Sequence, residues 1–174
     1  MCVFGHSFVK NLPKNPFRKY NVKILGVGGG RARSIMDSQE YTNLLAFKPE
    51  FCFVQIGGND IHNGYTSKEI CMDIYNLYTA LKAENINVVF GEVFIRPKPY
   101  VISPKAYQSK RTAINHCLRK MFSDRYDLLK YNNADSTFIK HDGVHLNGKG
   151  YRMFTNAILI QMEKFLRENY RGIK

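Results

Sequence analysis

The chain has 174 residues, of which 44% are hydrophobic and 23% are charged. This length suffices for one hydrophobic core and is short for two, and the composition is that of an ordinary globular domain, which excludes a disordered or fibrous protein. The formal net charge of +12 indicates a positive surface that would attract nucleic acid, an anionic membrane or an acidic substrate, without selecting among them. A solvated surface that keeps the protein in solution explains the same charge.

The sequence predicts neither a secretory leader at its start nor a membrane span. Residues 1–5 lack a positive region and a long apolar run, and no window reaches the ~18 apolar residues that a span needs. We therefore expect a single domain over residues 1–174 in an intracellular setting. Because the first predicted strand begins at Met1, the domain could be a piece of a longer protein.

Short apolar runs alternate with longer segments of helical period, a pattern typical of a parallel sheet with helices on both faces. The runs are rich in Val, Ile and Phe; they cover residues 1–5, 22–27, 51–56 and 88–94, with a weaker fifth run near residues 126–131. The predicted fold class is α/β, a three-layer α/β/α sandwich around a mostly parallel five-stranded sheet.

Helix signals lie between these runs. The capping box Thr66-x-x-Glu69 begins a helix, and residues 104–125 form a second, with Pro104 in its first turn. The last helix begins near Asn147, and its polar tail, residues 167–174, is expected to fray. The apolar positions expected to face the core are Ile70, Ile74, Leu77 and Leu81 in the first helix, Ile114, Cys117, Leu118 and Met121 in the second, and Met153, Phe154, Ala157, Ile158 and Phe165 in the last.

The cysteines are widely spaced and form no Cys-x-x-Cys pair. They lie in apolar stretches, which favours reduced core residues over disulfides or metal ligands. They are Cys2, Cys52, Cys71 and Cys117.

Candidate functional residues follow the predicted strands. Ser7 comes after the first strand, the glycines 28–30 after the second and Asn59 after the third. Loops at the carboxyl ends of parallel strands meet at one edge of the sheet, where ligands bind. Asp142 and His145 precede the last helix and can reach the same edge.

Ser7 is a candidate nucleophile. It lies in the segment Phe4-Gly5-His6-Ser7-Phe8, where Gly5 permits a sharp turn after the strand. A serine needs a base to take its proton, and the base needs a partner that fixes its tautomer. An isolated serine at this position could instead be only a helix N-cap.

The spacing Asp142-x-x-His145 lets the carboxylate reach one imidazole nitrogen and leaves the other free to accept the Ser7 proton. Attack on an ester also creates an oxyanion, for which backbone N–H groups of the glycine run and the amide of Asn59 are candidate donors. A glycine run after a strand can also bind phosphate, but neither G-x-G-x-x-G nor G-x-x-x-x-G-K-[ST] occurs in the required context.

Together these four segments resemble the consensus blocks of the SGNH (GDSL) hydrolases, in their order. Gly5-His6-Ser7-Phe8 matches the first block, the glycines ending at Gly29 the second, Gly57-Gly58-Asn59-Asp60 the third and Asp142-x-x-His145 the last. The resemblance implies a flavodoxin-like SGNH hydrolase fold, a catalytic triad of Ser7, Asp142 and His145, and an oxyanion hole formed by Ser7, Gly29 and Asn59. Three consecutive glycines leave Gly28 or Gly30 as alternatives to Gly29. The chain is also similar to the SGNH-like domains of metazoan and retrotransposon-derived proteins.

The chain departs from this pattern at His6, where the family's first block usually has Asp. The family's aspartate is not the proton acceptor, so the relay is retained, although loop geometry or substrate preference could change. His6 could also act as a second base. The chain lacks the closing Gly of G-x-S-x-G, which argues against the α/β-hydrolase fold.

Metal and cofactor chemistry are not expected. His141 and His145 are four residues apart, but Gly143 between them and a helix that begins only near Asn147 deny them a common helical face. Three tyrosines could line an acyl pocket, stack on bases, or simply belong to the core or surface: Tyr65, Tyr100 and Tyr107.

Two functional hypotheses follow. The first is a serine esterase that hydrolyses small acyl esters through an acyl-enzyme on Ser7, as the resemblance implies. The second is an SGNH-like module that binds RNA or DNA with vestigial hydrolysis, suggested by the net charge of +12 and by His6. The acyl group, the alcohol and the oligomeric state are not specified by the sequence.

Overall fold

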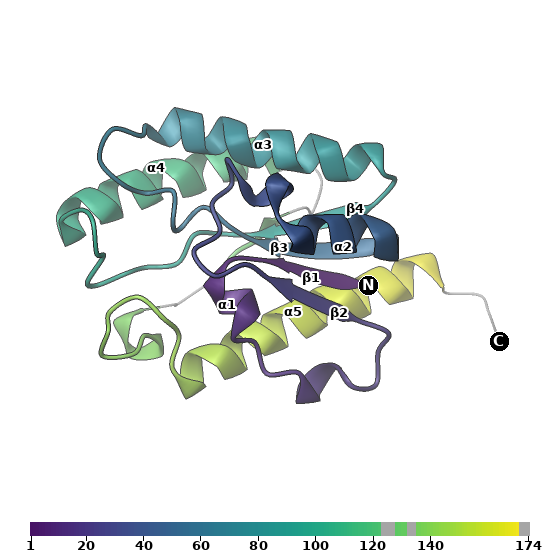
Figure 1. Cartoon of the computed structure of the whole chain (residues 1–174). Coiled ribbons are helices and arrows are strands. Elements are labelled where there is room, and N and C mark those ends of the chain that lie inside the picture. Colours follow the sequence, from purple (N-terminus) through teal and green to yellow (C-terminus); the bar gives the residue numbers. More distant parts are fainter. Residues whose placement is uncertain (123–127, 132–134, 171–174) are drawn as a thin grey trace.

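The computed structural model describes residues 1–122, 128–131 and 135–170. In this part of the chain, parallel strands form one sheet in the order β2-β1-β3-β4-β5 (Figure 1). The strands are β1 (Cys2–Gly5), β2 (Lys23–Gly26), β3 (Phe51–Gln55), β4 (Asn87–Gly91) and β5 (Leu128–Leu129). The parallel sheet and the α/β class predicted from the sequence are confirmed.

Helices cover both faces of the sheet. Figure 1 shows α2 (Gln39–Phe47), α3 (Ser67–Ala83) and α4 (Pro104–Phe122) on one face, and α1 (Ser7–Lys10) and α5 (Gly148–Asn169) on the other. Short 3-10 helices lie at Asn15–Phe17, Ile35–Asp37 and Ser136–Phe138. None of the helices in the described ranges is long and apolar enough to cross a bilayer.

Two apolar cores fill the space between the layers. Because successive side chains of a strand point to opposite faces, Phe4 of β1 joins Leu44 of α2 in one core, while Val3 joins Phe154 of α5 in the other. Strands buried on both faces require continuous apolar sequences. This requirement explains why β1, β3 and β4 stand out as uninterrupted apolar runs.

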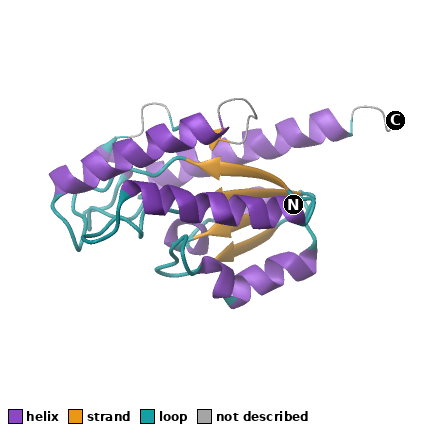
Figure 2. Cartoon of the chain, turned by 90° about the horizontal axis from the view of Figure 1, so that it is seen from above, coloured by secondary structure: helices purple, strands orange, loops and turns teal. Residues whose placement is uncertain are grey.

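The strand order positions the functional loops. After β2 the chain crosses back past β1 and adds β3 on its other side, so the order reverses between β1 and β3. Figure 2 shows the loops gathered beyond the arrowheads of the strands, at their carboxyl ends. In doubly wound sheets the crevice at this reversal binds ligands.

Several boundaries differ from the sequence predictions. The last helix continues to Asn169 instead of fraying from Arg167, because Phe165 packs on Phe51 of the sheet and the side chain of Arg167 donates to the carbonyl of Glu163. Helix α2 was not predicted. The predicted fifth strand contains β5, and residues 123–127 and 171–174 lie outside the described part of the chain.

The predicted core positions are largely buried, and all four cysteines are free thiols. Cys2, Cys52 and Cys71 are buried, whereas Cys117 is partly exposed at the surface of α4. The predicted core position is therefore confirmed for Cys2, Cys52 and Cys71, but not for Cys117.

Candidate functional site

Ser7 is the first residue of α1 and is half-buried at the carboxyl end of β1. Gly5 turns the chain with φ of 150°, and a Cβ atom at Gly5 would lie 2.1 Å from the carbonyl oxygen of Gln55. Only glycine fits this contact between strands. The tight turn therefore exposes Ser7 at the edge of the sheet.

The N-cap of α1 is His6, so the alternative that Ser7 is only a cap is wrong. The Nδ1 atom of His6 accepts a hydrogen bond from the backbone N–H of Phe8 at 3.3 Å. Burial lowers the pKa of His6 well below its usual range, and the neighbouring Arg96 and His145 lower it further. A buried, neutral imidazole with Nδ1 engaged as an acceptor serves as a structural cap.

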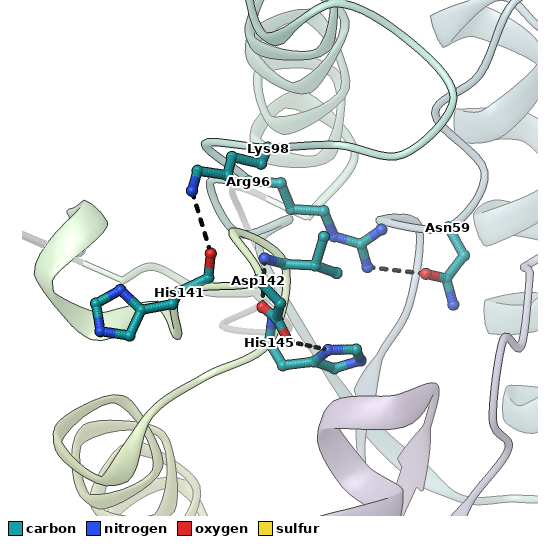
Figure 3. A network of polar contacts seen from close by, with 7 residues as sticks. Asn59, Arg96, Lys98, His141, Asp142 and His145 are labelled. Carbon is teal, nitrogen blue, oxygen red and sulfur yellow. Dashed lines mark hydrogen bonds and ion pairs between the residues drawn. The ribbon is translucent and has the colours of Figure 1, made fainter.

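Asp142 and His145 form the contact that their spacing predicts. The Nδ1 atom of His145 lies 2.9 Å from Oδ2 of Asp142, while Oδ1 of Asp142 accepts hydrogen bonds from the backbone N–H groups of Val144 and His145 (Figure 3). Partial desolvation acts to raise the pKa of Asp142, but these hydrogen bonds outweigh it and lower the pKa to about 2. The carboxylate is therefore ionised at neutral pH and holds the imidazole by one nitrogen.

The imidazole of His145 lies beside α1. Its ring centroid is 6.5 Å from that of Phe8, the residue after Ser7. The structure gives the Ser7 hydroxyl no hydrogen bond with any described residue, so a direct contact between Ser7 Oγ and His145 stays a prediction.

The glycine segment forms a turn after β2. The N–H of Gly30 donates to the carbonyl of Val27 at 3.1 Å, which closes a β-turn over residues 27–30. Gly29, the third residue of this turn, has φ of 71°, a positive value that favours glycine. Because the N–H of Gly30 is used in the turn, it is excluded as an oxyanion donor. Within the described ranges, the backbone N–H groups of Gly28 and Gly29 have no hydrogen-bond partner.

Asn59 connects this turn to the loop after β4. Its Nδ2 atom donates to the carbonyl of Gly30 at 2.9 Å, and its Oδ1 atom accepts from a terminal nitrogen of Arg96 at 2.8 Å (Figure 3). Arg96 was not selected from the sequence as a candidate site residue. Its position just after a strand, the criterion that selected Ser7 and Asn59, could have identified it.

Asp60 binds the backbone of the segment that follows this turn. It is fully buried, and both of its carboxylate oxygens accept from the backbone N–H of Ala32, at 3.0 and 3.2 Å. Burial raises the pKa of Asp60 to about 6, against the lowering effect of this hydrogen bond. The sequence identified Asp60 as part of a block without indicating this role.

The three tyrosines have different surroundings. Tyr107 is a core residue whose hydroxyl donates to the carbonyl of Phe94, Tyr100 is exposed, and the ring of Tyr65 stacks on His62. Among the described residues, no group of three or more His, Cys, Asp or Glu side chains could hold a metal ion.

One protein-family model matches most of the chain. Residues 4–153 match the model of the GDSL-like lipase/acylhydrolase family. The chain belongs to this family. Its members are ester hydrolases, so the chain is a serine ester hydrolase by family. A search of curated protein sequences finds no match.

Solved structures share the fold at low sequence identity. A protein described as an acylhydrolase from Bacteroides fragilis is 18% identical with a TM-score of 0.81, over 95% of this chain and 87% of that chain. A carbohydrate esterase of family 3 from Talaromyces cellulolyticus is 13% identical with a TM-score of 0.73, over 97% and 99% of the two chains. The esterase EstA from Pseudoalteromonas sp. is 14% identical with a TM-score of 0.66, over 95% and 98%. The SGNH hydrolase fold implied by the sequence resemblance is confirmed.

Proposed function

We propose that the protein hydrolyses small acyl esters through a Ser7-His145-Asp142 triad and an acyl-enzyme intermediate. The observation that carries this proposal is the Asp142–His145 pair, 2.9 Å apart, whose ring stands beside the short helix that begins with Ser7. With Nδ1 bound to the carboxylate, Nε2 is the nitrogen left to accept a proton.

In the first half-reaction, Nε2 of His145 takes the proton of Ser7 as Oγ attacks the carbonyl carbon of the ester. The protonated imidazole, stabilised by Asp142, then returns the proton to the departing alcohol, which leaves an acyl group on Ser7. In the second half-reaction, water gives its proton to His145 and attacks the acyl carbon. The protonated His145 then returns this proton to Ser7 Oγ as the acid leaves, which restores the serine hydroxyl.

The developing oxyanion needs donors that are fixed before the reaction. Ser7 begins α1, so its backbone N–H has no partner within the helix. The N–H of Gly29 and the second N–H of the Asn59 amide complete the proposed hole. Gly28 remains the alternative to Gly29, because the N–H of Gly30 is bound to Val27.

Hydrolysis of p-nitrophenyl acetate tests this proposal. We expect Ser7→Ala to lose the activity and its labelling by a fluorophosphonate probe. Ser103→Ala is the control, because Ser103 also lies at the start of a helix but is not part of the proposed triad. Its hydroxyl oxygen accepts a hydrogen bond from the backbone N–H of Ala106 in α4. Equal rates in wild type and Ser7→Ala would reject the triad. The esterase EstA was solved inhibited by monoethylphosphonate, a reagent of related phosphonate chemistry.

The charge supports RNA binding as a second candidate function. The chain has 26 Lys and Arg residues against 14 Asp and Glu residues, which leaves a net charge of +12. Binding that depends on these cations weakens steeply with salt. Fluorescence anisotropy with single-stranded RNA over a salt series tests it, and absence of binding at low ionic strength would remove this candidate.

A further inference from the structure

Arg96 is a buried cation with no carboxylate partner. It is 8% exposed, lies in the loop between β4 and α4, and forms no ion pair with any Asp or Glu of the described residues. Burying a charge without a counter-ion is unfavourable, because the charge loses its hydration. A cation kept in such a place points to a role at the site that it faces.

The side-chain hydrogen bond of Arg96 is made to Asn59, and its guanidinium also lies near Tyr107. A terminal nitrogen donates to Oδ1 of Asn59 at 2.8 Å, and its guanidinium carbon lies 5.8 Å from the centroid of the Tyr107 ring. A Cβ atom at Gly58 would lie 2.9 Å from the same terminal nitrogen. The glycine therefore lets the guanidinium reach the Asn59 side chain.

This contact decides which way the Asn59 amide faces. A guanidinium has only donors, so the atom of Asn59 that faces Arg96 must be the oxygen. The NH2 group then faces the other way, where one N–H is used by the carbonyl of Gly30 and the second remains. Figure 3 shows the guanidinium directed at Asn59.

We propose that Arg96 is a positioning residue, which fixes the Asn59 amide with its N–H groups toward the reacting carbonyl and polarises that amide. The inference rests on the proposed role of Asn59 in the oxyanion hole. A hydrogen bond to a charged donor on Oδ1 draws electron density from the amide, so its N–H becomes a stronger donor where negative charge develops. The effect should therefore fall on kcat more than on KM.

Kinetics of Arg96→Met, Arg96→Lys and Asn59→Ala test this inference. Asn59→Ala should lower kcat by about 10²–10³-fold, and Arg96→Met by about 10–100-fold with little change in KM. Arg96→Lys, which keeps a charged donor, should recover part of the loss. In the double variant, Arg96→Met should cost less than about 3-fold beyond Asn59→Ala, because the residues act as one unit.

Arg111→Met is the matched control. Arg111 is also a partly buried arginine of this region, but it donates to the carbonyl of Val93 and the side chain of Gln108 and does not contact Asn59. It should lower the melting temperature without the selective loss of kcat. Full additivity of Arg96→Met and Asn59→Ala, or equal kcat effects of Arg96→Met and Arg111→Met, would overturn the inference.

A measurement independent of activity separates this inference from the proposed function. The side-chain NH2 resonances of Asn59, assigned by their loss in Asn59→Asp, should shift in Arg96→Met and stay in place in Arg111→Met. Unchanged resonances in Arg96→Met would overturn the positioning role even in an active enzyme. An inactive wild type that the fluorophosphonate probe does not label would reject the esterase proposal, and the resonances would still decide whether Arg96 orients Asn59.

Discussion

The imidazole of His6 accepts a hydrogen bond from the backbone N–H of Phe8, 3.3 Å from its Nδ1 atom, at the start of the helix that carries Ser7. An imidazole can accept at Nδ1 only when that nitrogen is unprotonated, so the proton of the neutral ring belongs on Nε2. The usual Asp of the family's first block could supply the same acceptor. His6 thus preserves the cap without adding a negative charge.

Loss of stability below the usual pKa of histidine is the first prediction. Burial lowers the pKa of His6 in the folded protein below its pKa in the unfolded chain. The contribution of His6 to the free energy of unfolding is therefore present above the unfolded-state pKa and is lost as the pH falls below that pKa. We expect the unfolding free energy of wild type, relative to His6→Asn, to fall by up to ~1.4 kcal/mol per pH unit below about pH 6.5. Urea unfolding of both proteins measures it. A difference that does not change with pH would contradict the neutral cap.

Asp142→Asn should lower kcat by between about 10² and 10⁴-fold, because an amide no longer holds the imidazole of His145 in the productive tautomer. Asp135→Asn is the control, since Asp135 accepts in a similar turn, from the N–H of Thr137 at 2.8 Å, without touching His145. Steady-state kinetics of the two variants decide the matter. Comparable activity in both would exclude Asp142 from the relay.

The buried carboxylate of Asp60 should oppose stability at neutral pH. The pKa of Asp60 is raised to about 6 in the folded protein, from a value near 3.8 in the unfolded chain. The contribution of Asp60 to the free energy of unfolding is therefore fully present below the unfolded-state pKa and is lost as the pH rises through about 6. We expect the stability of wild type relative to Asp60→Asn to be higher at about pH 4 than at pH 7.5, by ~1–3 kcal/mol. Chemical unfolding at the two pH values provides the test, and the opposite sign would show that the carboxylate gains more from Ala32 than it loses by burial.

Gly5→Ala should destabilise the fold by at least about 3 kcal/mol, because the new methyl group would overlap the carbonyl oxygen of Gln55, only 2.1 Å away. Gly64→Ala separates this overlap from backbone strain, since Gly64 also has a positive φ, 77°, but nothing lies within 4 Å of the added atom. It should cost ~1–2 kcal/mol. Thermal unfolding compares the variants. Equal losses would mean that backbone conformation, not the contact with β3, requires Gly5.

The elements most visible in the sequence are those with strong local signals. The apolar runs of β1, β3 and β4 and the capping box at Thr66 identified their elements, because burial on both faces and a paired cap leave direct traces in composition and spacing. Helix α2 was missed because Leu44 is the only one of its residues that is fully buried. Its sequence therefore shows little helical periodicity of apolar residues. Ser7 was correctly located at the end of β1, but it was considered from the sequence as the N-cap of a following helix, whereas the N-cap of α1 is His6.

The sequence by itself determined the fold class, the family blocks and the short-range Asp142–His145 contact, since these depend on residue type and near neighbours along the chain. The tertiary structure alone decided that Gly30 is not a free donor, that His6 is a buried cap, that Asp60 holds Ala32 and that Arg96 faces Asn59. Arg96 and Asn59 are separated by 37 positions, and only the parallel order of β3 and β4 brings their loops together. Contacts of that kind are set by strand order and burial, which a pattern of neighbouring residues does not encode.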